Sequence, residues 1–245
     1  MLENLAALQA SYQEKGFVVV RQFYTRGEMS QLRASMLQYC KLYPDYCVPE
    51  MSAGKEGKLL FQALDFAERI GFMKSFLESQ KLQVHLESLL KEPAHLFIED
   101  FHFKEPGGGA YDPHQDMQSP VIQWVNERYA PSVPIDKLVT MCLAVDEHTI
   151  ENGCMQVAAG IHKQGGLGPE GGVLEKEIVD SLNFEPIELA AGDALFFDGY
   201  CPHGSAVNTS SSSRKALFLF FNPKRCGYQR KMAQDYFLHD KFKLK

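Results

Sequence analysis

Hydrophobic residues recur at helical spacing through the first third of the chain. Leu5, Leu8 and Tyr12 lie three or four residues apart, which predicts a helix over residues 2–15 that ends at Gly16. Because such spacing places apolar side chains along one side of a helix, this segment is expected to pack against a core through that side.

Local start signals predict where the next helix begins. Thr25 and Glu28 form a capping box, in which each side chain accepts a hydrogen bond from the other residue's backbone N–H. Leu32, Met36 and Tyr39 then supply an apolar side for the helix. The same reasoning predicts a buried strand at 17–20, a loop at 44–57 and further helices at 66–78 and 80–91.

From residue 94 the apolar pattern changes from helical spacing to the pattern of strands. Residues 95–103 predict a long strand, which Gly107 and its two glycine neighbours end. Further strands are predicted at 111–116, 137–145, 154–158, 186–190, 194–198 and 214–221. Short strands separated by turn residues predict a mainly β fold with flanking helices, of the barrel or jelly-roll type.

These elements predict one domain across residues 1–245. It comprises a helical N-terminal layer at about 1–93, a jelly-roll core at about 94–223 and a C-terminal tail at 224–245. The tail, with Arg225, Arg230 and Lys231, is expected to be a solvated helix or an extended end.

Composition and charge exclude several classes of partner. The chain carries a formal net charge of −6 and has no long basic run, so nucleic acid is not an expected partner. No apolar run approaches the ~20 residues that cross a bilayer, and the first residues lack a signal-peptide pattern. Six cysteines without a C-x-x-C pair favour free thiols in a reducing compartment. A cytoplasmic location without membrane contact is therefore expected.

A candidate metal site begins at His114, Gln115 and Asp116. Side chains alternate along a strand, so His114 and Asp116 are expected to share a face and to hold one metal ion. His203, which follows the predicted strand at 194–198, is the natural third ligand. Two histidines and one carboxylate leave three octahedral positions open, an arrangement suited to non-haem iron(II) with a bidentate oxoacid and dioxygen.

A candidate cosubstrate residue follows in the next predicted strand. Arg214 precedes the apolar run at 216–221, where an unpaired guanidinium would be costly to bury. Its planar group matches a carboxylate through two parallel hydrogen bonds, as the distal carboxylate of 2-oxoglutarate would require. The candidate metal site and Arg214 together therefore predict that 2-oxoglutarate is a cosubstrate.

Motifs in a fixed order extend this pattern, and through them the chain resembles the phytanoyl-CoA dioxygenase family of iron(II)/2-oxoglutarate oxygenases. The motifs are His114-Gln115-Asp116, Glu151-Asn152-Gly153-Cys154, Gly192-Asp193, His203 and Arg214. The resemblance spans about residues 94–223. An isolated H-x-D pattern is weak evidence, whereas the ordered set is specific.

The resemblance implies a double-stranded β-helix that binds iron(II) through His114, Asp116 and His203. It further implies that Arg214 binds 2-oxoglutarate with help from Ser205 and Gln115. Cys142 stands where some members carry an aromatic residue of the cosubstrate pocket. Lys58 is a candidate for the lysine that members of the family carry upstream of the metal motif. The implied reaction consumes dioxygen and 2-oxoglutarate, releases succinate and carbon dioxide, and hydroxylates an unactivated C–H bond of a small metabolite.

Three other functions remain open at this stage. The same scaffold can carry out desaturation, cyclisation or epimerisation in natural-product biosynthesis. A zinc hydrolase could use the same ligands, although Arg214 argues against it. A cupin-like metal-binding module without turnover is the third. The substrate is expected to be small and either polar or natural-product-like.

Residues for substrate binding are expected in and near the segment 117–136. This segment, with Trp124 and Arg128, is predicted to be either a substrate lid or a surface loop. Tyr111 and Phe103 are expected in the pocket wall or in the core. The six other histidines are expected to be structural or exposed: His85, His95, His102, His148, His162 and His239.

Overall fold

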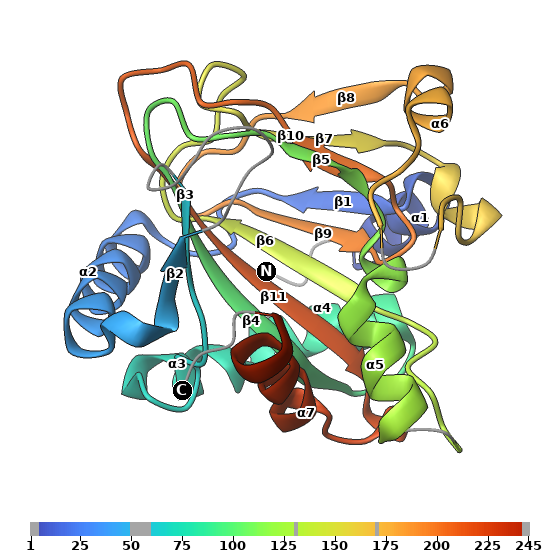
Figure 1. The fold of residues 1–245 in the computed structure, drawn as a ribbon, viewed down its shortest axis with the longest axis horizontal. Coiled ribbons are helices and arrows are strands. Elements are labelled where there is room, and N and C mark those ends of the chain that lie inside the picture. Colours follow the sequence, from blue (N-terminus) through green and yellow to red (C-terminus); the bar gives the residue numbers. More distant parts are fainter. Residues whose placement is uncertain (1–4, 50–59, 130–131, 170–171, 242–245) are drawn as a thin grey trace.

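Two antiparallel sheets face each other at the centre of the molecule (Figure 1). The structure is a computed structural model that describes residues 5–49, 60–129, 132–169 and 172–241. Within these residues the larger sheet has the strand order β1-β9-β6-β11-β4-β3-β2 and the smaller sheet the order β5-β10-β7-β8.

The strands of the larger sheet are β1 (Phe17–Val20), β2 (Cys47–Pro49), β3 (Leu60–Ala63), β4 (Ala94–Lys104), β6 (Val139–Ala144), β9 (Ala194–Asp198) and β11 (Arg214–Pro223). Those of the smaller sheet are β5 (Tyr111–His114), β7 (Met155–Ala158), β8 (Phe184–Ile187) and β10 (His203–Ser205). The longest pairing joins β4 to β11, from Lys104 opposite Arg214 to Ala94 opposite Pro223.

Alternation along β11 separates the two faces of the larger sheet. Leu217, Leu219 and Phe221 belong to one hydrophobic cluster, whereas Ala216 and Phe218 belong to another. The second cluster includes residues of β7 and β8, so it fills the space between the sheets. The alternation of side chains along a strand therefore gives β11 an outer and an inner face, although the run at 216–221 is apolar throughout.

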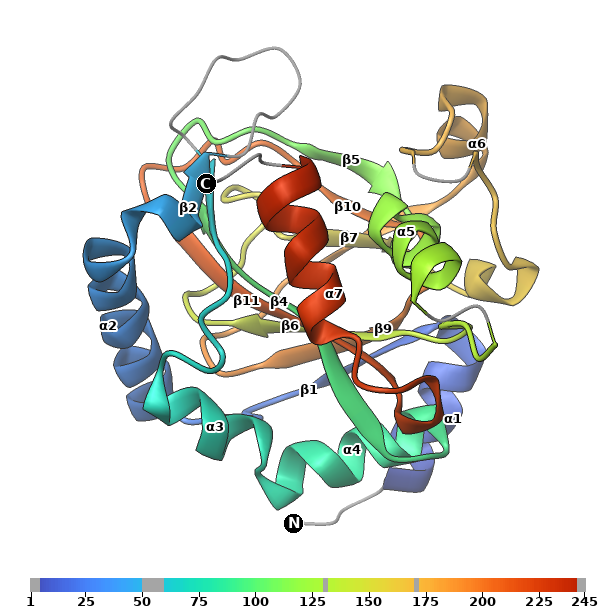
Figure 2. The same cartoon turned by 60° about the horizontal axis from the view of Figure 1, so that its bottom comes forward.

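Four helices cover the outer face of the larger sheet: α1 (Leu5–Lys15), α2 (Arg26–Leu42), α3 (Gly71–Leu77) and α4 (Gln80–Leu90). Figure 2 shows α2, α3 and α4 following one side of the sheets, with α5 (Pro120–Arg128) and α7 (Arg230–Asp235) together in front. The last helices are α6 (Lys176–Ser181) and a π-helix at Tyr236–Lys241. No helix in the described ranges is long and apolar enough to cross a membrane.

The predicted fold class is confirmed, because two antiparallel sheets form the core and helices flank them. The capping box is also confirmed: Thr25 Oγ1 accepts from the N–H of Glu28 at 3.2 Å, and Glu28 Oε2 accepts from the N–H of Thr25 at 2.7 Å. Three strands (β2, β3 and β10) and two helices (α5 and α6) were not predicted, whereas α7 lies where a helix was one of the two alternatives. The unpredicted strands have three or four residues and the unpredicted helices nine and six, so each gives only a short periodic signal.

Two predictions for the ends of elements were wrong. The helix expected at 66–78 begins only at Gly71. The loop expected at 44–57 contains β2 at Cys47–Pro49, and its residues 50–59 lie outside the described part of the chain. In the second case the strand is stabilised by its pairing with β3, which local sequence does not reveal.

The prediction of a solvated C-terminal stretch was wrong for Arg230. Its side chain is buried, and Nε donates to Glu99 Oε2 at 2.9 Å with a second contact from Nη2 to Glu99 Oε1. Arg230 also pairs with Asp65 at 3.2 Å and with Glu68 at 3.0 Å. Glu99 lies on β4, far away in the sequence, so α7 is attached to the sheet by a buried ion pair.

Replacing Arg230 with Met should lower the free energy of unfolding by ~3–5 kcal/mol, because Glu99 would stay buried without its cation. The measurement is chemical denaturation of both proteins. Arg225→Met is the matched control, since Arg225 pairs with Glu92 and Asp136 at the surface, where such pairs contribute below ~1 kcal/mol. Equal losses in the two variants would contradict a structural role for the buried pair.

Candidate metal centre

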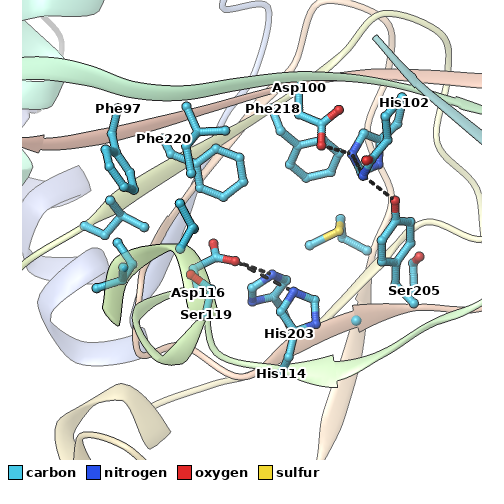
Figure 3. Close-up of a pocket in the computed structure, with 18 of the residues that line it drawn as sticks. Phe97, Asp100, His102, His114, Asp116, Ser119, His203, Ser205, Phe218 and Phe220 are labelled. Carbon is cyan, nitrogen blue, oxygen red and sulfur yellow. Dashed lines mark hydrogen bonds and ion pairs between the residues drawn. The ribbon is translucent and has the colours of Figure 1, made fainter. Parts of the chain in front are cut away.

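Two neighbouring strands of the smaller sheet bring the predicted metal ligands together. His114 at the end of β5 and His203 at the start of β10 are direct partners in the antiparallel register. Asp116 follows in a short 3₁₀ helix, Asp116–Gln118. The ligand atoms of these three residues all lie within 4.8 Å of one another (Figure 3). The structure thus assembles the three residues that the sequence singled out.

Hydrogen bonds orient each ligand toward a common point. His114 Nδ1–H donates to the carbonyl of Asp112 at 2.7 Å, and His203 Nδ1–H donates to the carbonyl of Cys201 at 3.0 Å. Both bonds leave Nε2 with a free lone pair, and both Nε2 atoms face Asp116 Oδ1, at 3.7 Å and 3.5 Å. Fixing the second ring nitrogen in this way is a common feature of metal-binding histidines.

The carboxylate ligand is held from the opposite side by β6. Thr140 Oγ1 donates to Asp116 Oδ2 at 2.6 Å, which leaves Oδ1 for a metal ion. Burial lowers the pKa of His203 to about 4, so its imidazole is neutral at physiological pH, the form that binds metal. Two imidazoles and one carboxylate fit iron(II), and three further positions would stay open for other ligands.

Replacing Thr140 with Val should lower iron(II) affinity by roughly 10–100-fold, the usual effect of losing a group that orients a metal ligand. The valine has nearly the same shape but leaves Asp116 Oδ2 without its hydrogen bond. Anaerobic iron(II) titration measures the change, and Thr140→Ser, which restores the hydroxyl, should recover most of the affinity. An iron affinity that is equal in wild type and Thr140→Val would show that the bond does not position Asp116.

A cavity of about 270 Å³ opens directly beside the triad. Arg214 lines it and is only 1% exposed. One guanidinium nitrogen donates to the carbonyl of Gly153, whereas Nε has no hydrogen-bond partner among the described residues. A buried cation with an unsatisfied donor beside a metal site fits a dicarboxylate such as 2-oxoglutarate, which can bind both.

A second buried cation, which the sequence did not single out, lies near Arg214. Lys104 is the β4 partner of Arg214 in the register, and its Nζ donates to Ser205 Oγ and to the carbonyl of Ala206, both at 2.7 Å. Ser205 also lines the cavity. Lys58, the lysine suggested by the family resemblance, lies outside the described residues.

The other residues predicted at the cosubstrate or in the cavity wall divide into two groups. Tyr111 lines the cavity. Phe103 packs in the outer core against Phe101, with ring centroids 4.9 Å apart. Cys142 is buried between the sheets, where burial raises the pKa of its thiol to about 12. Neither Phe103 nor Cys142 lines the cavity.

Gln115 was expected to help bind 2-oxoglutarate, but its side chain points to neighbouring loops. Its Nε2 donates to the carbonyls of Gly165 at 2.9 Å and Tyr200 at 2.6 Å, and its Oε1 accepts from Leu167 N–H at 2.8 Å. Gln115 does not line the cavity. Its amide therefore ties the metal motif to two neighbouring loops, and we treat it as a positioning residue.

The segment at 117–136 is largely helical in its described part, rather than an open loop. Trp124 and Arg128 contact each other, with the guanidinium 4.9 Å from the ring, and Trp124 also packs on Tyr236. Neither residue lines the cavity. Instead Ser119, Val121 and Ile122, at the start of α5, do so. A proline at the first position of α5 is a helix start signal, and neither alternative, lid or surface loop, takes it into account.

Three polar residues of β3 and β4 were not predicted to line the cavity. His102 was expected to be structural or exposed, but it lines the cavity together with Asp100 and Gln62. The four other described histidine side chains, His85, His95, His148 and His162, do not line it, and the side chain of His239 is not described. Alternation along β4 could have grouped Asp100 with His102, but only the pairing of β4 shows which face meets the cavity.

The facing sheets, the His-Asp-His triad and the buried Arg214 form the arrangement expected of one class of protein, the non-haem iron(II)/2-oxoglutarate oxygenases. Within that class, a family model described as phytanoyl-CoA dioxygenase (PhyH) matches residues 12–216. The chain belongs to this family.

Two curated relatives are enzymes of phosphonate oxidation. A methylphosphonate hydroxylase from Gimesia maris is 34% identical over 151 residues, which is 61% of this chain and 54% of that protein. A 2-aminoethylphosphonate dioxygenase from an uncultured bacterium is 32% identical over 189 residues, 77% of this chain and 67% of that protein. The chain therefore spans about half the length of the first relative and two thirds of the second.

Solved structures share the fold. The non-haem α-ketoglutarate-dependent carbocyclase SnoK of nogalamycin biosynthesis superposes with a TM-score of 0.75 at 17% identity, covering 89% of this chain and 83% of that one. EctD from S. alaskensis, crystallised with 2-oxoglutarate and 5-hydroxyectoine, gives a TM-score of 0.73 at 17% identity, covering 90% and 76%. These likenesses confirm the predicted jelly roll.

Proposed function

We propose that the protein is an iron(II)- and 2-oxoglutarate-dependent dioxygenase that hydroxylates a C–H bond of a small phosphonate. The observation that carries the proposal is the cavity, which is lined both by the metal triad and by the buried Arg214. The phosphonate class is supported by the two relatives, whose names state that they act on methylphosphonate and on 2-aminoethylphosphonate.

The chain's own residues would prepare the site in three ways. His114, Asp116 and His203 hold the metal on one side, and the hydrogen bond from Thr140 fixes the carboxylate. Arg214 binds the distal carboxylate of the cosubstrate. When bound, iron(II) with 2-oxoglutarate supplies the activation of dioxygen that C–H oxidation requires.

Apolar side chains close the cavity around the reacting carbon. Val121 and Ile122 of α5 lie on one side, and Phe220 of β11 and Phe237 of the π-helix complete the wall. These side chains offer no hydrogen bonds to water, so a bound substrate would exclude water from its oxidised carbon. Trp124 and Arg128 would act on this wall only indirectly, by packing behind α5.

The test is oxygen consumption and succinate formation with a panel of alkyl- and aminoalkylphosphonates. We expect both signals to require iron(II) and 2-oxoglutarate and to rise with a phosphonate, with a hydroxylated product of 16 mass units more than the substrate, the mass of one added oxygen atom. A product two mass units lighter would indicate desaturation or cyclisation instead. No coupled turnover with any phosphonate would overturn the proposed substrate class.

We further propose a cytoplasmic location. All six cysteines are free in the structure, and four of them, Cys142, Cys154, Cys201 and Cys226, are buried. Free thiols of this number are typical of a reducing compartment.

A further inference from the structure

The cavity side of β4 carries four side chains that change in character along the strand. Ile98, Asp100, His102 and Lys104 alternate along the strand, so their side chains share a face, with about 6.8 Å between successive members. Lys104 lies opposite Arg214 in the register, at the end that fits the cosubstrate anion. The series therefore runs from a cationic end, through His102, to a carboxylate and then to an apolar end.

Asp100 is a buried carboxylate with unused hydrogen-bonding capacity. The residue is 9% exposed, and its Oδ2 lies 2.8 Å from His102 Nε2. Its Oδ1 has no hydrogen-bond partner among the described residues. A carboxylate can accept about four hydrogen bonds, and burying one without sufficient partners is costly. No lysine or arginine in the described part of the chain forms an ion pair with Asp100, so a cationic partner from outside the protein would suit it.

Aromatic rings lie on the same side of the cavity as this carboxylate. Figure 3 shows Asp100 and His102 across the cavity from the metal triad, with Phe218 and Phe220 on the same side as Asp100. Phe218 lies directly opposite Asp100 in the register, and its ring is 4.7 Å from that of His102. A carboxylate beside aromatic faces is an environment that binds an ammonium group, through hydrogen bonds and through cation–π attraction.

The position of Asp100 limits the size of the ligand. Thr140, which holds the metal ligand Asp116, lies on β6, while Asp100 lies on β4 with β11 between them. Thr140 is level with Ile98, two residues from Asp100 along the strand. Two strand spacings of about 4.8 Å and this offset of about 6.8 Å place the backbones of Thr140 and Asp100 about 12 Å apart. The side chains of Thr140, Asp116 and Asp100 occupy part of this distance. A ligand that reaches both the metal and Asp100 therefore needs only a few atoms between its two ends.

We propose that Asp100 is the residue that selects the substrate, by binding a protonated amino group at the end remote from the metal. This inference rests on the proposed function and specifies it: among small phosphonates, the enzyme prefers those with a cationic amine. A second anion is disfavoured at this place because the Asp100 carboxylate repels it, and the cations Arg214 and Lys104 lie at the other end of the series.

The test compares 2-aminoethylphosphonate with propylphosphonate, in which a methyl group replaces the ammonium. For wild type loaded with iron(II) and 2-oxoglutarate, we expect kcat/KM to favour the amine by at least roughly tenfold. In Asp100→Asn, which keeps the shape and removes the charge, kcat/KM for the amine should fall by roughly 30–100-fold, mostly through KM. The value for propylphosphonate should stay within about threefold.

Calorimetry under anaerobic conditions gives a readout that does not depend on turnover. We expect Asp100→Asn to weaken the binding of 2-aminoethylphosphonate but to leave the binding of 2-oxoglutarate unchanged. Asp180→Asn is the matched control, because Asp180 is exposed on α6 and, among the described residues, its ion-pair partner is Lys176. Its kinetics with both compounds should equal those of wild type.

The outcomes separate the inference from the function on which it rests. Turnover of phosphonates without preference for the amine, or an equal loss for both compounds in Asp100→Asn, overturns the role of Asp100 and leaves the proposed function in place. Binding of the amine that depends on Asp100, without any turnover, supports the inference and overturns the proposed reaction. If wild type neither binds nor oxidises the amine, the role of Asp100 is overturned. The proposed function is overturned as well if no other phosphonate of the panel is turned over.

Discussion

His203→Ala should abolish turnover while leaving the fold intact. His203 provides one of three ligand atoms for the metal, and two remaining ligands cannot hold iron(II) firmly on one side of its coordination sphere. The loss of iron affinity should exceed the ~10–100-fold loss that follows when a group that only orients a metal ligand, such as Thr140, is removed. β10 is held by pairing with both β5 and β7, so the backbone should keep its place.

Anaerobic iron(II) titration and succinate formation measure the two effects, and circular dichroism checks the fold. His95→Ala is the control, because His95 is outside the cavity and its ring packs on Tyr228. Near-wild-type iron affinity in His203→Ala would show that the metal binds elsewhere. A similar loss in His95→Ala would show that the effect comes from destabilisation.

Arg214→Lys should weaken 2-oxoglutarate binding by ~1.5–3 kcal/mol, or about 10–150-fold, with little change in iron affinity. The guanidinium can form two parallel hydrogen bonds with a carboxylate, and an ammonium on a shorter reach forms fewer. Arg214 is fully buried, so water cannot replace the missing bond. Titrating 2-oxoglutarate into the anaerobic iron(II) protein gives both dissociation constants.

Lys215→Arg serves as the control, because Lys215 is the next residue on β11 and its Nζ pairs with Asp146 at 3.4 Å rather than lining the cavity. Its cosubstrate affinity should match that of wild type. If Arg214→Lys also kept the wild-type dissociation constant, the carboxylate contact would have to be assigned elsewhere, with Lys104 and Ser205 as the nearest candidates.

The metal ligands could be predicted because their signals are local. His114 and Asp116 are two residues apart, and His203 follows a strand that is apolar enough to recognise. Arg214 could be predicted because a cation that opens an apolar strand is unusual. In each case one short stretch of sequence contained both the residue and the reason to notice it.

The remaining site residues depend on pairings between distant strands. Nothing near Lys104 in the sequence shows that Arg214 and Ser205 are its neighbours, and Asp100 reads as one more polar residue in a strand. Arg230 was assigned to solvent because its partner Glu99 lies on another element. Trp124, the single tryptophan of the chain, does not line the cavity, whereas the smaller Val121 on the same helix does.

The alternation of β4 has a consequence for how such an enzyme could change over evolutionary time. Substitutions at Ile98 or Asp100 would alter the groups that face the substrate, whereas Lys104, on the same strand, lies beside the cosubstrate end. Ile98 and Lys104, the two ends of the series, are six residues apart, which is about 20 Å along the strand. Mutations at distant sites usually act independently. A lineage could therefore acquire new substrates step by step along one strand without losing the oxygen chemistry on which every step depends.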